Sequence, residues 1–121
     1  MANVLMMGLE ESIGQQIEKI ATQANHSVRC SPMQRHLENR PDADLVFVSG
    51  DQKDYISTIY SIRSYHNAPP VVVVTRLPET DDWLDALEAG AADYCSAPFE
   101  PVQIRWILDS ALGRPRAFAM G

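Results

Sequence analysis

Five short apolar runs, each followed by a segment with helical periodicity, constrain the fold of this chain more than any other feature. The runs lie near residues 3–7, 27–30, 44–49, 70–75 and 92–95. The fourth run, with the sequence VVVVT, is apolar on both faces, as a strand covered by helices on both sides of a sheet requires. With right-handed crossovers, the pattern predicts a single α/β domain, a doubly wound (βα)5 fold with a parallel sheet in the order 2-1-3-4-5.

Residues that favour helix starts mark the first two of the five expected helices. Ser12 can cap the first, with Gln15 as its capping-box partner. Ser31 followed by Pro32 predicts a short second helix, because proline is favoured at the first helical position. The residues expected to face the core are Ile13, Ile17, Ile20, Ala21 and Ala24 in the first helix, and Met33 and Leu37 in the second.

The three later helices are predicted from the same kinds of signal. The third should begin between Asp51 and Asp54, the fourth at Thr80 and the fifth near Pro101, and Gly90 supplies the exit from the fourth. The residues expected to face the sheet are Ile56, Ile59, Tyr60 and the stem of Arg63 in the third helix, Leu84, Leu87 and Ala91 in the fourth, and Ile104, Ile107, Leu108 and Ala111 in the fifth.

Length and cysteine content indicate one domain without covalent cross-links. We expect the domain to span residues 1–113 and residues 114–121 to form a tail or the start of a linker. Cys30 and Cys95 end strands at opposite edges of the predicted sheet, too far apart for a disulfide. His26, His36 and His66 are scattered, so we expect no metal site from the histidines.

The charge balance excludes several kinds of partner. Ten basic and sixteen acidic residues give a net charge of −6, which opposes binding to nucleic acid. The apolar runs are far shorter than a membrane helix, and the N-terminus lacks the pattern of a signal peptide. We therefore expect a cytoplasmic protein that binds neither nucleic acid nor membrane.

Four segments resemble, in order and spacing, the receiver domain of two-component response regulators, which has the flavodoxin-like or CheY-like fold. They are DLVFVS (44–49), PPVVVVT (69–75), ALEAGAADY (86–94) and APFEP (97–101). The most specific stretch is AGAADYCSAPFEP (89–101), which is similar to the family's Gly-Ala-x-x-Tyr-x-x-Lys-Pro-Phe run. The resemblance extends from Asn3 to about Leu112.

The positions that should carry the family's chemistry hold uncharged residues. The resemblance implies an aspartate that accepts a phosphoryl group, an acidic pair that holds magnesium and a lysine that neutralises the phosphoryl charge. This chain has Ser49 at the acceptor position, Gly8 and Leu9 at the acidic pair, and Ala97 at the lysine. We therefore expect a degenerate receiver that is not phosphorylated in the ordinary way.

Three other positions match the family pattern. Thr75 matches the switch threonine, Tyr94 matches the switch aromatic, and Pro98 matches a proline that follows a cis peptide bond. Thr75 and Tyr94 can preserve the switch movement or can fill structural roles. We favour structural roles, because the input that would move the threonine is missing.

Three acidic residues lie close to the expected site but are displaced from the family's positions, and these displaced acids leave two interpretations of the strand ends open. Glu10 and Glu11 lie just beyond the expected acidic pair, and Asp51 lies two residues beyond the expected acceptor. These carboxylates could rebuild a divalent-ion site and permit phosphorelay. We favour the other interpretation, in which Glu10 and Glu11 serve the start of the first helix and Asp51 that of the third.

Four residues mark a candidate partner surface on the last two helices and the strand between them. They are Trp83, Tyr94, Val102 and Trp106. Trp106 shares a helix face with Val102, away from the residues expected to face the sheet, and aromatic residues are enriched at interfaces. The alternative is that both indoles cover the margin of the core.

Together these features predict a pseudo-receiver that acts as a protein-interaction or regulatory module in bacterial signalling. It would bind a protein partner or a second copy through the surface just described, with no cofactor and no catalytic residues. Two alternatives remain: a receiver phosphorylated through the displaced acids, and a small-molecule sensor that uses the vacated pocket. An enzyme is the least favoured class, because no nucleophile and base are placed together by the local pattern.

Overall fold

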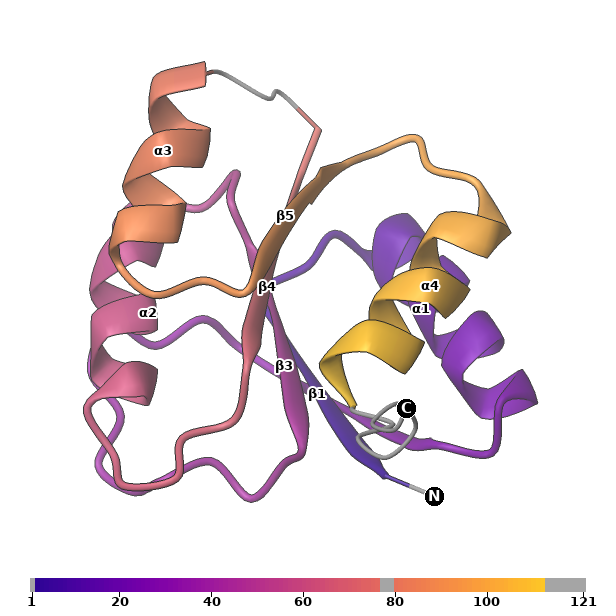
Figure 1. The fold of residues 1–121 in the computed structure, drawn as a ribbon, viewed down its shortest axis with the longest axis horizontal. Helices are drawn as coiled ribbons and strands as arrows, with labels where there is room; N and C mark the ends of the chain where they lie inside the picture. The colour runs from indigo at the N-terminus through magenta and orange to yellow at the C-terminus, as the bar shows by residue number, and fades with distance from the viewer. Residues whose placement is uncertain (1, 77–79, 113–121) are drawn as a thin grey trace, which may run out of the picture.

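The computed structural model describes residues 2–76 and 80–112, apart from the side chains of residues 80–82. The predicted boundary at residue 113 and the tail 114–121 lie outside this part of the chain. A five-stranded parallel sheet has the order β2-β1-β3-β4-β5, as the sequence predicts (Figure 1). The predicted doubly wound order is confirmed.

All five strands begin and end within one residue of their predicted limits. The strands are β1 (Asn3–Met7), β2 (Ser27–Ser31), β3 (Leu45–Ser49), β4 (Val71–Thr75) and β5 (Asp93–Ser96). The described helices are α1 (Glu11–Gln23), α2 (Tyr55–Arg63), α3 (Thr80–Glu88) and α4 (Pro101–Ala111).

The core consists of two layers, one on each face of the sheet. Helices α1 and α4 cover one face, where Ile17, Ile104 and Leu108 pack against inward residues of the strands such as Phe47. Helices α2 and α3 cover the other face, as Figure 1 shows. The strands β3 and β4 are buried along their whole length, which explains why their sequences are continuously apolar.

The predicted second helix is wrong, because the chain between β2 and β3 forms an irregular loop instead. Side chains of α2 and of the turn after it bond to its backbone. Thr58 Oγ1 donates to the carbonyl of Gln34 (2.6 Å), the amide of Leu37 donates to Ser61 Oγ (2.8 Å), and Tyr65 Oη donates to the carbonyl of Leu37 (2.6 Å). These tertiary bonds replace helical ones, while Leu37 is buried as predicted.

The start of α1 also differs from its prediction. The N-cap is Glu10 rather than Ser12, and no side chain caps the helix. Ser12 Oγ donates to Glu10 Oε1 (3.0 Å), and Gln15 Nε2 donates to Glu11 Oε2 (3.3 Å). Ser12 therefore hydrogen-bonds to a neighbouring side chain and does not cap the backbone of the helix.

Three side chains on the α2/α3 face of the sheet, those of Tyr60, Leu84 and Leu87, are exposed although they were predicted to face the sheet. Tyr60 is 60% exposed, Leu84 48% and Leu87 38%, whereas Ala86 and Ala89 pack against the sheet in their place. The helical period of α3 is compatible with either stripe, so hydrophobicity alone selects the wrong one. In contrast, Ile59 in α2 and the buried stripe of α4 follow the prediction.

Two further sequence expectations concern the cysteines and membranes. Cys30 and Cys95 are free and lie on the two edge strands of the sheet. Burial, and secondarily the charge of Asp93, raises the pKa of the Cys95 thiol to about 12. Among the described helices, none has the length and apolar character that crossing a bilayer demands.

Two glycines provide a matched test of this backbone. Gly90 has a φ of +112°, and a Cβ there would lie 3.1 Å from Arg63 Cγ, whereas a Cβ on Gly14 within α1 would meet Met6 Cε at 3.5 Å, an ordinary contact. We expect Gly90→Ala to lower the free energy of unfolding by about 1–2 kcal/mol and Gly14→Ala to raise it by about 0.5–1 kcal/mol. Urea unfolding measures both, and equal effects of the two changes would contradict the described backbone.

Candidate functional site

The carboxyl ends of β1, β3 and β4 meet at one edge of the sheet, where ligands bind in folds of this kind. The structure places uncharged residues at the four positions that the resemblance singled out. Leu9 and Ala97 pack against the core layer under α1 and α4, and Ser49 is only 4% exposed. Gly8 contributes its backbone carbonyl, which accepts a hydrogen bond from Gln52 Nε2 (3.2 Å). None of these four residues brings a charge to the site.

The connection from β5 to α4 is tied to the end of β4. The amide of Ala97 donates to the carbonyl of Thr75 (2.8 Å), and the peptide bond between Ala97 and Pro98 is cis, as the resemblance implied. Ala97 is partly buried and packs against the core layer under α1 and α4.

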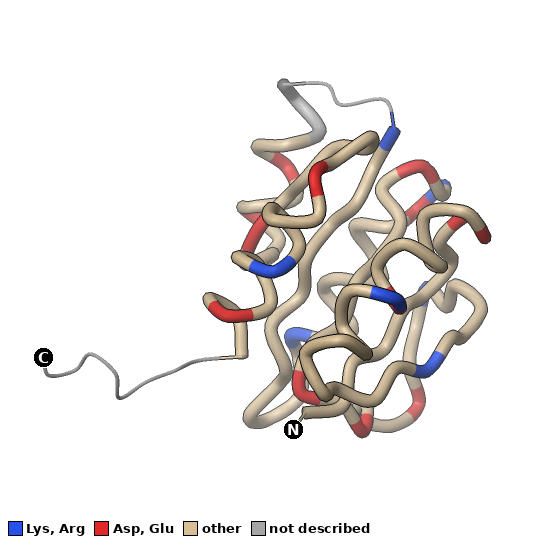
Figure 2. The backbone as a smooth tube through the Cα atoms, turned by 90° about the vertical axis from the view of Figure 1, so that its right-hand side faces the viewer, with Lys and Arg blue, Asp and Glu red and all other residues tan. Residues whose placement is uncertain are grey.

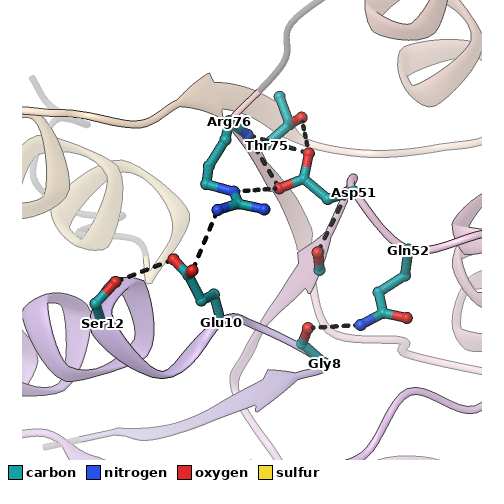
Figure 3. A network of polar contacts seen from close by, with 8 residues as sticks. Gly8, Glu10, Ser12, Asp51, Gln52, Thr75 and Arg76 are labelled. Carbon is teal, nitrogen blue, oxygen red and sulfur yellow. Dashed lines mark hydrogen bonds and ion pairs between the residues drawn. The ribbon is translucent and has the colours of Figure 1, made fainter.

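Asp51 is the carboxylate at the centre of the strand ends, although it does not occupy the acceptor position. Its Oδ1 accepts a hydrogen bond of 2.6 Å from Thr75 Oγ1, and both of its oxygens lie 3.1 Å from the amide nitrogen of Arg76 (Figure 3). Its own amide donates to Ser49 Oγ (3.2 Å). The expectation that Asp51 serves the start of α2 is wrong, since Asp54 is the N-cap of that helix.

Arg76 supplies the positive charge that the site would otherwise lack. Its Nε lies 3.4 Å from Asp51 Oδ2, and its Nη1 lies 3.1 Å from Glu10 Oε2 (Figure 3). The guanidinium thus lies between the two carboxylates and pairs with both. Sequence reasoning missed this residue, although its position directly after Thr75 at a strand end was a usable signal.

The displaced acids do not converge on a common point. Glu10 faces Arg76 and Ser12, whereas Glu11 accepts a hydrogen bond from Gln15 on the exposed side of α1. In the parts of the chain that the structure describes, no three metal-ligating side chains come together. Glu10 and Glu11 lie at the start of α1, as the favoured interpretation expected, but neither caps its backbone.

This arrangement is suited to holding loops together rather than to transferring a group. The network of Asp51, Thr75, Arg76 and Glu10 joins the β1–α1 and β3–α2 loops to the end of β4. Ser49 Oγ already accepts the amide of Asp51, and the Asp51 carboxylate itself is bound to Thr75 and Arg76. Activation of the serine would need a base that is free to take its proton.

An open groove of about 710 Å³ lies beside this network, where β1 and β2 end. Its walls combine apolar and sulfur-bearing side chains, such as Leu9 and Met33, with exposed glutamates, such as Glu11 and Glu18. Its volume falls within the usual range for small-molecule pockets. Of the positions that the resemblance singled out, Gly8 and Leu9 line this groove, whereas Ser49, Thr75 and Ala97 do not.

The four residues of the expected partner surface lie on α3, β5 and α4. Val102 is 69% exposed, Trp106 63% and Trp83 45%, so the indoles extend into solvent rather than covering the core margin completely. Tyr94 is half-buried and packs against the core layer under α2 and α3. Val102 and Trp106 border a groove of about 490 Å³ between β5 and α4.

A comparison of two double-mutant cycles tests which contact holds the network. Thr75 is 1% exposed, whereas the side chains of Arg76 and Glu10 are each about half exposed to solvent. We expect a coupling free energy of about 1–2 kcal/mol for Thr75→Val with Asp51→Ala, and less than about 1 kcal/mol for Arg76→Gln with Glu10→Gln. Chemical denaturation of the single and double variants measures both, and the reverse order would contradict the described geometry.

About half of the chain is similar in sequence to known regulatory proteins. The "Transcriptional regulatory protein PrrA" of Mycobacterium tuberculosis is 39% identical over 62 residues, which are 51% of this chain and 27% of that protein. The "Regulatory protein AtoC" of Escherichia coli is 31% identical over 72 residues, or 60% of this chain and 16% of AtoC. The chain thus spans about a quarter or less of the length of these relatives. No protein-family model matches the sequence.

Solved structures match nearly the whole chain. A two-component response regulator from Clostridium difficile has a TM-score of 0.78 at 18% identity, covering 96% of this chain and 99% of its own. An orphan response regulator of H. pylori has a TM-score of 0.74 at 23% identity, covering 92% and 96%. The BeF3-activated N-terminal receiver domain of Klebsiella pneumoniae RstA has a TM-score of 0.74 at 20% identity, covering 93% and 99%. This chain therefore has the fold of response-regulator receiver domains, and about half of its sequence is similar to known regulatory proteins.

Proposed function

We propose that this receiver domain works without aspartyl phosphorylation, as a cytoplasmic protein-interaction or regulatory module of two-component signalling. The observation that carries the proposal is the binding of the Asp51 carboxylate by Thr75 and Arg76. A phosphoryl group on an ordinary receiver would need an anionic acceptor, a metal ion and a positive charge around a vacant space. Here an internal carboxylate and an internal guanidinium fill that space.

Phosphorylation through the displaced acids is the first alternative. Attack by Asp51 on a phosphodonor would require its oxygens to leave Thr75 Oγ1 and the backbone and side chain of Arg76. Magnesium would in addition have to displace the Arg76 guanidinium from between Asp51 and Glu10. Both changes remove favourable charge pairing before any new bond forms, so we give this alternative second place.

A small-molecule sensor is the other alternative, favoured by the groove beside β1 and β2. The polar side chains that line it include Glu10, Glu11 and Glu18, all of them exposed to water. Binding of a ligand there would gain little from carboxylates that remain solvated. We therefore rank a sensor below an interaction module.

In the proposed mechanism, the domain presents a preformed surface and performs no covalent step. The network at the strand ends fixes the loops, and the surface on α3, β5 and α4 binds a protein. Affinity would come from removing exposed aromatic side chains from water. No enzyme activity and no cofactor are part of this proposal.

Incubation with acetyl phosphate and Mg²⁺, followed by intact-mass measurement, tests the proposal. We expect the mass of the wild-type protein to stay unchanged, because Ser49 is neutral and Asp51 is engaged. An Arg76→Gln variant serves as the control, since it removes the guanidinium from Asp51 and Glu10 while leaving the same number of carboxylates.

An adduct on the wild-type protein that disappears in Asp51→Ala would overturn the proposal in favour of phosphorylation through the displaced acid. An adduct that appears only in Arg76→Gln would support the role of the guanidinium in closing the site.

A further inference from the structure

The net charge of the chain lies in one part of the fold. By sequence, the segment from Thr80 to Leu112 holds seven acidic residues and a single basic one, Arg105, a balance of −6. The whole chain also has a net charge of −6, so all other residues together are neutral. This segment forms α3, β5 and α4. Five of its acidic side chains are described, those of Asp85, Glu88, Asp93, Glu100 and Asp109, and Figure 2 marks acidic positions in red.

The same elements carry most of the large apolar side chains that face solvent. Of the six exposed large hydrophobic residues in the described chain, five lie on α3 or α4, and only Tyr60 lies elsewhere. The five are Trp83, Leu84, Leu87, Val102 and Trp106. Acidic residues and exposed apolar residues therefore lie on the same three elements, and exposed apolar side chains gathered in this way are typical of interaction sites.

Strand β5 is the centre of this surface and ends the sheet at that edge. Helices α3 and α4 lie on either side of it, as Figure 1 shows. Beside the strand, the groove that Val102 and Trp106 border also includes Asp93, which adds a carboxylate next to the apolar walls. A partner that fills this groove would meet apolar and acidic groups together.

We propose that this α3–β5–α4 surface docks a basic protein segment whose apolar side chains fill the groove beside Trp106. This inference rests on the proposed function as an interaction module and names the chemistry of its partner. The argument is charge complementarity: Lys and Arg side chains offset the excess of negative charge, and apolar anchors cover the exposed indole.

A second copy of the chain is the less suitable occupant. Pairing two copies through α3, β5 and α4 would bring together two sets of described side chains, each with five acidic residues and one basic residue, a balance of −4. Like charges brought together at an interface oppose association, and each copy has only Arg105 on these elements to offset them. The balance of charge therefore favours a different, basic partner.

The test uses the whole chain and a fluorescent synthetic helical peptide built of Leu and Lys, with two matched peptides. One matched peptide has Glu in place of Lys, and the other has Ser in place of Leu. We expect the Leu/Lys peptide to bind more than tenfold more tightly than either, with an affinity that falls as salt is added. Fluorescence anisotropy measures the three affinities.

Matched variants locate the binding to the surface. Trp106→Ala should weaken binding of the Leu/Lys peptide at least tenfold, whereas Tyr60→Ala, which removes a similarly exposed aromatic from α2, should change it less than twofold. Glu88→Gln in α3 should reduce the salt dependence of the affinity for the Leu/Lys peptide, whereas Glu18→Gln in α1 should leave it unchanged.

Equal effects of Trp106→Ala and Tyr60→Ala, or equal binding of the Glu peptide, would overturn the inference. Self-association of the wild type that Trp106→Ala abolishes, measured by sedimentation, would overturn it in favour of a second copy. Each of these failures leaves the mass measurement with acetyl phosphate untouched, so the proposed function would stand or fall separately.

Discussion

The hydrogen bond between Thr75 and Asp51 is the interaction on which the account of this molecule depends. It joins the buried end of a central strand to a carboxylate that Arg76 also holds, and Arg76 reaches on to Glu10. The Asp51 carboxylate accepts a hydrogen bond from the hydroxyl of the almost completely buried Thr75. The Arg76 guanidinium in turn pairs with the charge of that carboxylate. The strand ends therefore hold the protein's own paired charges, whereas Trp83, Val102 and Trp106 on α3 and α4 are exposed to solvent.

The sheet could be predicted from the sequence because strands that are buried on both faces have continuously apolar sequences. Runs such as Val71–Thr75 have no polar face, as strands of a parallel sheet covered on both faces require. The missing helix after Ser31 shows the limit of this reasoning. Serine and proline favour a helix start locally, but Thr58, Ser61 and Tyr65, far along the chain, bond to the backbone of that loop.

The acidic members of the candidate site, Glu10 and Asp51, could be named from the sequence, but their pairing with Arg76 could not. Reading Ser49 and Ala97 at the matching positions requires only alignment of a pattern along the chain. The pairing of Asp51 with Arg76 joins residues 25 apart in sequence, and it depends on how two loops leave neighbouring strands. Similarly, the helical period of α3 permitted two buried stripes, and the packing of Ala86 rather than Leu84 decided which side chains face solvent.

The most direct test of the central claim is an NMR titration of the ¹⁵N-labelled protein with beryllofluoride and Mg²⁺, which together mimic a phosphoryl group on an aspartate. If Thr75 and Arg76 already hold Asp51, the amide resonances of Ser49, Thr75 and Arg76 should keep their positions throughout the titration. A saturable shift of these resonances that is lost in Asp51→Ala would contradict the account, because it would show a site still open to a phosphoryl group.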